Sequence, residues 1–339
     1  MLADRAAMAL RAVPTSDDRA IGDAASAPTA SAREVLRLLV DGVRAGHRGV
    51  LATITDLTGS GARAVGAHMA VLDNGISAGS FSSGCVERAI VAEALAVLRE
   101  GASRTMRFGQ GSPYIDIRLP CGGGMDVLFL ADPAPDVLAR AVASLDARRP
   151  VALRLDPAGQ LSASADATAA ATGWESGAFI ARHVPTLRLV LIGHGAEMLT
   201  SLGLARSFGA DVELYSPDRE IVGAGLAAGV ASVRLRTVDS PVQLSGDRWT
   251  AFLFLFHDHD WEPPLIRKAL ETDSFWIGAM GSRSTHAARR AALAAHGVAE
   301  PAITRVRGPV GLIPASRDPA TFALSALAEI VGAYRARLP

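Results

Sequence analysis

Cysteine and lysine are scarce in this sequence of 339 residues, and each scarcity excludes a class of site. The two cysteines, Cys85 and Cys121, cannot form a disulfide framework or supply the four thiolates of a zinc or iron–sulfur site. So few cysteines are typical of a protein in the reducing cytoplasm, where we expect this one. A Schiff base or a phosphate-binding P-loop would depend on Lys268, the only lysine, and no glycine loop surrounds it.

An excess of either charge and a long apolar run are also missing. The 34 basic side chains are balanced by 34 acidic ones, so no basic face for nucleic acid or membrane lipid is expected. No run approaches the roughly 18 apolar residues of a membrane span. Residues 1–30 are rich in Ala, Ser, Thr, Pro and Asp without a sustained period, and we expect a disordered arm there.

The remaining sequence predicts two domains with a linker between them. Residues 31–157 combine a helix capped by Ser31 with several short strands, which predicts a smaller N-terminal α/β or α+β domain that carries both cysteines. Residues 158–186 are rich in Ala, Ser, Thr and Gly and predict a linker or an irregular interdomain segment. In residues 187–339, strands alternate with helices, and this predicts a Rossmann-like, doubly wound parallel sheet.

A glycine turn follows the first strand of the C-terminal domain. Gly193, His194 and Gly195 connect an apolar strand to a helix, where a Rossmann fold brings its backbone close to a phosphate. The third small residue of the usual motif is replaced by Met198, and no acid ends the next strand. Ser216 stands there instead, which leaves open a phosphorylated ribose, another pyrophosphate compound or a purely structural turn.

The two cysteines lie beside glycine and serine. If Ser83 caps a helix, Cys85 falls in its first turn, where the helix dipole favours the thiolate, and Gly84 would offer a backbone amide. Cys121 begins a run of three glycines with little side chain to bury it. Reactive thiols, with Glu87 as a polar neighbour, and small buried side chains are both compatible with this pattern.

Polar residues also follow two later strands of the predicted sheet. His257 and His259 come after the strand 251–256, at the edge where open α/β sheets bind ligands. Contact with a ligand's polar groups is the first interpretation, and a metal site is the second. Gly281, Ser282 and Arg283 repeat the order strand, glycine, helix, and indicate either an anion contact or a capped helix.

Taken together, these segments resemble the XdhC/CoxF family of accessory proteins of xanthine-dehydrogenase-type molybdenum hydroxylases. The resemblance covers about residues 35–335. It depends on seven motifs in the family's order: 79–87, Cys121-Gly-Gly, 191–195, His257-Asp-His259, 276–283, 308–312 and Ala328-Glu329. Ser83 departs from a usual glycine, and Ser216 from a common acid.

The resemblance implies a chaperone that binds molybdenum cofactor (molybdopterin, alone or as a dinucleotide). It further implies that the protein protects or helps to sulfurate this cofactor and delivers it to the hydroxylase, with a sulfur donor protein as a further partner. Cys85 matches the family cysteine associated with the cofactor and is a candidate molybdenum contact. A homodimer is expected because most soluble oligomers are symmetric dimers.

Two other functions remain open at this point. An NAD(P)-dependent oxidoreductase could use the same glycine turn, with a cysteine or histidine as proton donor. A non-catalytic scaffold could bind the hydroxylase and hold its cysteines for packing alone.

Overall fold

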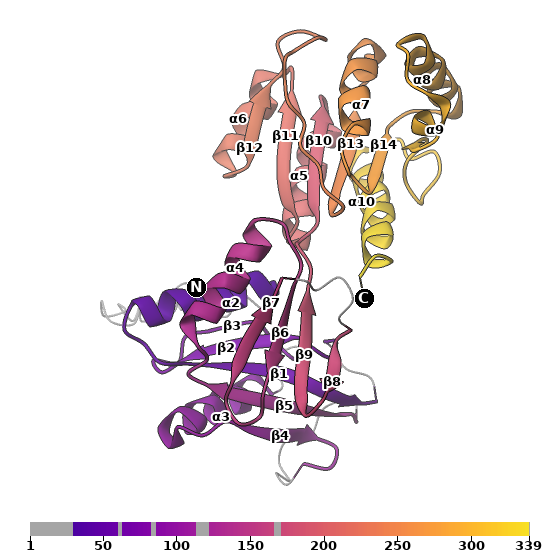
Figure 1. Cartoon of the computed structure of the whole chain (residues 1–339). Helices are drawn as coiled ribbons and strands as arrows, with labels where there is room; N and C mark the ends of the chain where they lie inside the picture. Colours follow the sequence, from indigo (N-terminus) through magenta and orange to yellow (C-terminus); the bar gives the residue numbers. More distant parts are fainter. Residues whose placement is uncertain (1–29, 60–62, 83–85, 113–121, 166–170, 339) are drawn as a thin grey trace, which may run out of the picture. The chain divides into compact units, whose positions relative to one another are not determined.

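The computed structural model describes residues 30–59, 63–82, 86–112, 122–165 and 171–338 (Figure 1). The side chain of His259 lies outside this description. The chain forms two compact units. One comprises Met1–Val142, Leu153–Ser164 and Thr172–Ala181, and the other comprises Ala143–Ala152, Ala165–Ala171 and Arg182–Pro339.

A five-stranded antiparallel sheet forms the centre of the first unit, in the order β3-β2-β1-β5-β4. Helix α3 packs its apolar side chains on one face, against alternate residues of β1 such as Val50 and Ile54. Helix α2 begins with a capping box in which Ser31 and Glu34 bond each other's backbone amides, as the serine predicted. The elements are α2 (Ala32–Arg44), β1 (Gly49–Thr58), β2 (His68–Leu72), β3 (Ser77–Ala78), α3 (Glu87–Glu100), β4 (Arg104–Gly109), β5 (Gly124–Ala131) and α4 (Pro135–Asp146).

Helix α3 begins later than the sequence predicts. Its N-cap residue is Val86, without a side-chain cap, so the helix begins at Glu87, two residues after Cys85 in the sequence. The difference arises because Glu87 bonds the preceding serines and holds Ser80–Ser82 in a non-helical turn.

A second sheet occupies much of the predicted linker. Four strands pair in the order β7-β6-β9-β8: β6 (Val151–Leu155), β7 (Leu161–Ser164), β8 (Gly173–Glu175) and β9 (Ala178–His183). The sequence did not predict these strands because the segment is rich in small residues. Ala178, Phe179 and Ala181 are nevertheless fully buried. The segment is therefore a structured part of the fold and differs from the predicted linker.

A six-stranded parallel sheet forms the centre of the second unit, in the order β12-β11-β10-β13-β14-β15. Counted within the unit, this order is 3-2-1-4-5-6, the Rossmann arrangement. The strands are β10 (Arg188–Gly193), β11 (Asp211–Ser216), β12 (Ala231–Arg234), β13 (Thr250–Leu255), β14 (Trp276–Ala279) and β15 (Val306–Arg307). The helices are α5 (Ala196–Phe208), α6 (Arg219–Ala227), η1 (His259–Trp261), α7 (Glu262–Leu270), α8 (Arg283–Ala295), α9 (Glu300–Ile303) and α10 (Pro319–Arg335).

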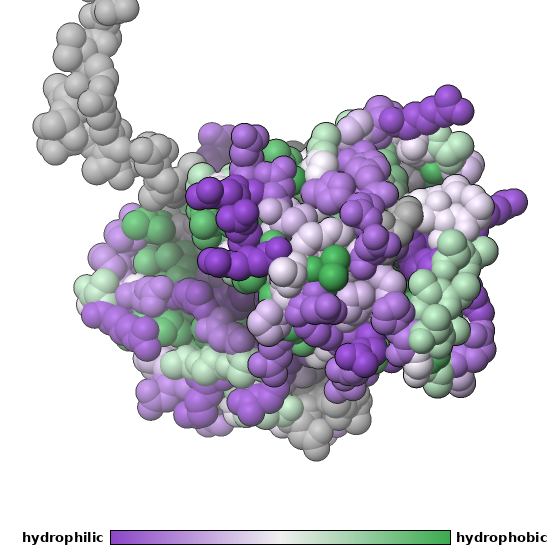
Figure 2. All heavy atoms as spheres, turned by 90° about the horizontal axis from the view of Figure 1, so that it is seen from above, coloured by the Kyte–Doolittle hydropathy of each residue, from purple (hydrophilic) through white to green (hydrophobic). Residues whose placement is uncertain are grey.

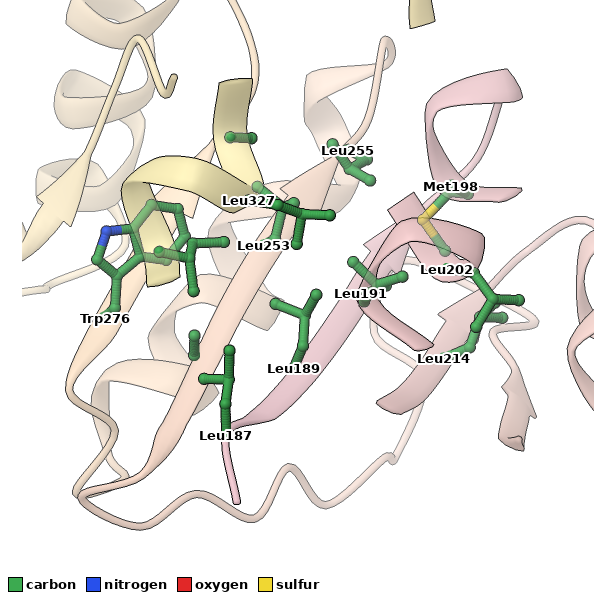
Figure 3. Packing of buried hydrophobic residues seen from close by; sticks show 14 of the residues in the cluster. Leu187, Leu189, Leu191, Met198, Leu202, Leu214, Leu253, Leu255, Trp276 and Leu327 are labelled. Carbon is green, nitrogen blue, oxygen red and sulfur yellow. The ribbon is translucent and has the colours of Figure 1, made fainter. Parts of the chain in front are cut away.

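Helices cover both faces of this sheet. On one face, side chains of β10 and β13 pack against Met198 and Leu202 of α5 and Leu327 of α10 (Figure 3). On the other, apolar residues of α7, α8 and α9 form a separate buried cluster. The predicted doubly wound fold is therefore confirmed, and its strand order reverses between β10 and β13, where such sheets bind ligands.

Candidate functional site

The glycine turn lies where β10 meets β13. A Cβ atom at Gly193 would lie 2.3 Å from the carbonyl oxygen of Leu255, so a glycine is required for the two strands to approach each other. Gly195 has a φ of 96° and is the N-cap residue of α5. A Cβ atom there would lie 3.0 Å from a Glu197 carboxylate oxygen and 3.4 Å from Nε2 of His257. The glycines thus serve strand packing and the close approach of these two side chains.

An acidic side chain occupies the first turn of α5. Oε2 of Glu197 lies 3.5 Å from Nε2 of His257, and the two side chains are 16% and 58% exposed. The His194 ring packs edge-on against Phe256 and lies 5.7 Å from the His257 ring. Because the carboxylate already satisfies the positive end of the helix dipole, this helix end is a poor place for a phosphate.

A cavity of about 860 Å³ opens beside this turn, at the edge where β13 and β14 end. Figure 2 views the molecule from the side at which these strands end, and the surface there is mainly hydrophilic with small hydrophobic areas. Four residues predicted for the site line the cavity: His257, Gly281, Ser282 and Arg283. The sequence did not single out these further lining residues: Glu197, Phe256, Thr285, Ile313, Arg317, Asp318 and Phe322.

The N-terminus of α8 forms one wall of the cavity. The hydroxyl oxygen of Ser282 accepts a hydrogen bond from the backbone N–H of Thr285 at 3.1 Å, so the predicted cap is present. The first turn of α8 contains no acid. Within the part of the chain that the structure describes, Arg283 and Arg317 have no acidic partner. The α8 wall therefore combines the positive charge of Arg283 with backbone donors, and Arg317 adds a second positive charge from the loop 308–318.

A buried ion pair supports the same wall. Nε of Arg289 donates to Oε2 of Glu262 at 2.7 Å, and both side chains are 1% exposed. The guanidinium also donates to the carbonyl of Met280 at 2.6 Å. His286, beside it, has a pKa below its usual value because of burial and the neighbouring Arg289 and Arg290. The pair fixes the end of β14 to α7 and α8.

Helix α10 holds the opposite wall. Oε2 of Glu329 accepts a hydrogen bond from the backbone N–H of Gly311, and Oγ of Ser325 accepts one from Ile313, each at 2.7 Å. The loop 308–318 is thereby fixed against the middle of α10. Glu329 belongs to a motif that the sequence singled out, but its partner lies 18 residues away and could not be foreseen.

Ser216 does not reach the ligand edge. Its side chain is fully buried, and its oxygen accepts a hydrogen bond from the backbone N–H of Asp218. The suggested contact of Ser216 with a phosphorylated ribose therefore disagrees with the structure. The sequence could not show this, because the last residue of a strand can face either the core or the solvent.

Glu87 is the centre of a hydrogen-bond network in the first unit. Its carboxylate accepts bonds from the hydroxyls of Ser80 and Ser82 and from the backbone N–H groups of Phe81 and Ser82, at 2.7–3.1 Å. Burial raises the pKa of this carboxyl, but the hydrogen bonds from Ser80 and Ser82 outweigh it, so the pKa lies below its usual value.

Ser83, Gly84, Cys85 and Cys121 lie outside the described residues. Described residues near them in the sequence, Ser80 and Gly123, lie close to Arg63 and Gly59 respectively. Nε of Arg63 donates to the carbonyl of Ser80 at 3.1 Å, and a Cβ atom at Gly59 would lie 3.4 Å from Cα of Gly123. One short stretch of the chain therefore contacts both the segment that leads to Cys85 and the one that follows Cys121.

Two absences apply to the described ranges alone. Among those residues, no three His, Cys, Asp or Glu side chains are grouped so that they could hold a metal ion. No helix in the same ranges has the length and apolar character needed to cross a membrane.

Comparisons with known proteins agree with this fold. Residues 189–330 match the family model of the XdhC Rossmann domain, and residues 43–109 match that of the XdhC and CoxI family. The molybdenum cofactor insertion chaperone PaoD of Escherichia coli strain K12 is 36% identical over 88% of this chain and 87% of its own. A crystal structure described as a xanthine dehydrogenase from Bacillus halodurans has a TM-score of 0.72 at 20% identity, covering 90% of this chain and 96% of that chain, and shows the shared fold. With both family models matched in order and a relative this similar over most of its length, the chain belongs to the XdhC family.

Proposed function

We propose that this protein is a cytoplasmic chaperone that binds molybdenum cofactor, protects it or assists its sulfuration, and delivers it to a molybdenum hydroxylase of the xanthine dehydrogenase type. The observation that carries the proposal is the cavity of about 860 Å³ with Arg283 and Arg317 on its walls. The similarity to a molybdenum cofactor insertion chaperone supports the same function.

The residues of the cavity fit molybdopterin as cargo. Its volume lies within the roughly 300–1,000 Å³ of ligand sites. Met280 and Phe322 offer apolar surface for a flat pterin ring, while the arginines and backbone donors suit a phosphate. The cofactor itself contributes a sulfur-bound molybdenum centre, for which a thiolate is a suitable soft ligand.

The phosphate is best accommodated at α8. The first turn of α5 contains the carboxylate of Glu197, which would repel an anion, whereas the first turn of α8 contains Arg283 and no acid. Gly193 and Gly195 then shape the backbone, and His194, His257 and His259 are candidates for polar contacts with the cargo. Ser282 contributes by capping the helix that meets the phosphate.

The cysteines are the candidates for chemistry at molybdenum. Cys85 would contact molybdenum or take part in sulfuration, Ser83 and Gly84 precede it in the sequence, and Cys121 is a second thiol. Glu87 positions the preceding segment through its four hydrogen bonds. The hydroxylase and a sulfur donor protein are the expected partners, and a homodimer is the expected assembly.

Anaerobic titration calorimetry tests the proposal. Purified full-length protein is titrated with molybdenum cofactor and, separately, with NADPH. We expect Arg283→Gln to weaken cofactor binding about tenfold, the effect of one charge-assisted hydrogen bond. Arg267→Gln is the matched control, because Arg267 is an exposed arginine of the same unit that does not line the cavity. Equal affinities in all three proteins would contradict the assignment of the cavity.

An NAD(P)-dependent oxidoreductase is the second candidate, favoured by the Rossmann strand order. It predicts an NADPH signal, unaffected by Cys85→Ala, and no binding of molybdenum cofactor. The chaperone instead predicts cofactor binding that weakens in Cys85→Ala. A scaffold that only docks the hydroxylase predicts that Cys85→Ala leaves activation of the hydroxylase intact.

A further inference from the structure

The large cavity has an acidic side chain on the wall that the phosphate does not use. Glu197 lies in the first turn of α5, which follows β10, whereas Arg283 begins α8, which follows β14, and both residues line the cavity. Because β13 separates these two strands, they lie two strand spacings apart, roughly 10 Å. The lining is therefore acidic on one side and basic on the other, and it suits a ligand whose two ends differ in the same way.

The carboxylate of Glu197 has acceptor capacity that the protein leaves open. Among the described residues no group donates a hydrogen bond to it, and its ionic partner is Nε2 of His257, 3.5 Å from Oε2. The side chain is 16% exposed, so a ligand in the cavity can reach it. Asp318, the other acid of the lining, already accepts a hydrogen bond from the backbone N–H of Thr321 at 2.8 Å. Glu197 is thus the acid best able to bind a ligand here.

A pterin has the chemistry that such a carboxylate recognises. An ionised carboxylate only accepts hydrogen bonds, and its two oxygens suit two parallel donors. The pyrimidine ring of a pterin presents two donors side by side, the 2-amino group and the neighbouring ring N–H. The substituents that lead to the phosphate of molybdopterin are on the other ring of the pterin. A donor edge and an anion therefore lie at opposite ends of this cargo.

We propose that Glu197 binds the amino edge of the pterin of molybdenum cofactor and so orients the cargo with its phosphate at α8. The inference rests on the proposed function and adds the residue that recognises the pterin. Met280 and Phe322 line the same cavity and offer apolar surface to the ring. A Cβ atom at position 195 would lie 3.0 Å from the carboxylate, so Gly195 leaves the space that the amino edge needs.

Two small fragments test which group Glu197 recognises. Pterin-6-carboxylate and lumazine-6-carboxylate differ at position 2, where lumazine has an oxo group in place of the amino group. In equilibrium dialysis against the full-length protein, we expect wild type to bind the pterin about tenfold more tightly. Glu197→Gln should lose most of this preference, because a carboxamide has one acceptor oxygen instead of two.

Glu220→Gln is the matched control. Glu220 is an exposed glutamate at the second position of α6, as Glu197 is at the second position of α5, and it does not line the cavity. Both variants remove a carboxylate that stabilises a helix N-terminus, so their melting temperatures should be similar. Only Glu197→Gln should change the preference for the pterin, which a purely structural role at the helix end would not alter.

Anaerobic titration with molybdenum cofactor separates this inference from the proposed function. If wild type does not bind the cofactor, the proposed function fails and the inference fails with it. If wild type binds it, Glu197→Gln should weaken binding about tenfold relative to Glu220→Gln. Equal cofactor affinities in these two variants, or no preference of wild type between the two fragments, would overturn the role of Glu197 and leave the proposed function standing.

Discussion

Glu87 interacts with its surroundings as an anchor rather than as an acid or base. Each carboxylate oxygen accepts hydrogen bonds from the segment Ser80–Ser82, so the charged form is favoured and the proton is held weakly. A residue that acts on the cargo would need a free lone pair in the direction of the cargo. This arrangement supports a positioning role for Glu87 next to the cysteine segment.

Glu87→Gln should lower the free energy of unfolding of the first unit by about 1 kcal/mol. The amide replaces an acceptor oxygen with a donor and removes the charge that strengthens the bonds. Urea unfolding followed by circular dichroism measures the change. Glu175→Gln is the control, since Glu175 is exposed on β8, and an equal loss in both variants would argue against the anchoring role.

The same carboxylate predicts a pH dependence. Because the pKa of Glu87 is lower in the folded than in the unfolded state, its contribution is complete above the unfolded pKa of about 4.3. It is lost as the pH falls through the folded pKa. The free energy of unfolding of the wild type should therefore approach that of Glu87→Gln below about pH 4.3. A difference in unfolding free energy that stays constant down to acidic pH would contradict the hydrogen-bond network.

How far the sequence predicts single residues depends on where their partners lie. Ser31 and Ser282 were predictable as caps because their partners follow within three residues, and both caps are present. The partners of Arg289 and Glu329 lie 27 and 18 residues away, and only the fold brings them together. A local cap signal also misplaced the start of α3, which begins at Glu87.

At the scale of elements, the close contact between β10 and β13 requires a glycine at position 193. Gly193→Ala should destabilise the second unit by at least about 2 kcal/mol, because its Cβ atom would overlap the carbonyl of Leu255. Gly203→Ala is the matched control: Gly203 lies inside α5 with nothing within 4 Å of a Cβ atom, so it should gain about 0.5–1 kcal/mol. Thermal unfolding monitored by tryptophan fluorescence distinguishes the two, and a tolerated Gly193→Ala would contradict this packing.

The strands of the Rossmann sheet were predictable because they are buried on both faces and form continuous apolar runs, as in β13. The strands β7, β8 and β9 were not predictable, because they are short and contain many small and polar residues. The loop 308–318 was noted only as a motif, since its place over the cavity depends on α10. Four of the residues predicted for the site therefore line the cavity at the predicted sheet edge, whereas the sequence did not place the loop 308–318 there.

Removing one member of the ion pair between α7 and α8 should be costly. Glu262→Gln leaves the buried charge of Arg289 without a counterion and should lower the free energy of unfolding by about 3–5 kcal/mol. Replacement of both residues by Leu and Met should cost less, because no charge then remains buried. Chemical denaturation of the single and double variants measures this, and a double variant that is no more stable than Glu262→Gln would contradict the account.

On the scale of the whole molecule, the two units are interleaved along the chain. Residues 143–152 belong with the second unit, although residues 153–164 and 172–181 belong with the first. The sequence instead predicts two continuous domains, 31–157 and 187–339, because the composition changes in the segment 158–186 between them. The compact units are defined by contacts in space, and Arg148 makes its hydrogen bonds to residues of the Rossmann unit.

Arg148 connects this early segment to the amino edge of the sheet. Its side chain is 11% exposed and donates to the carboxylates of Asp211 and Asp247 and to the carbonyl of Thr186. Burial raises the pKa of Asp247, but the bonds from Arg148 and the backbone hold it below its usual value. An arginine with these partners stabilises the start of β10, β11 and β13 together.

Arg148→Ala should therefore destabilise the second unit by about 2–4 kcal/mol, since it removes the arginine counterion of two partly buried carboxylates. Tryptophan fluorescence during urea unfolding reports on this unit, because Trp249, Trp261 and Trp276 belong to it. Arg149→Ala removes an exposed neighbouring arginine and should stay within about 0.5 kcal/mol of wild type. If both variants unfolded at the same urea concentration, residues 143–152 would not be a stabilising part of the Rossmann unit, and a fragment starting near residue 187 should then fold as well as the full chain.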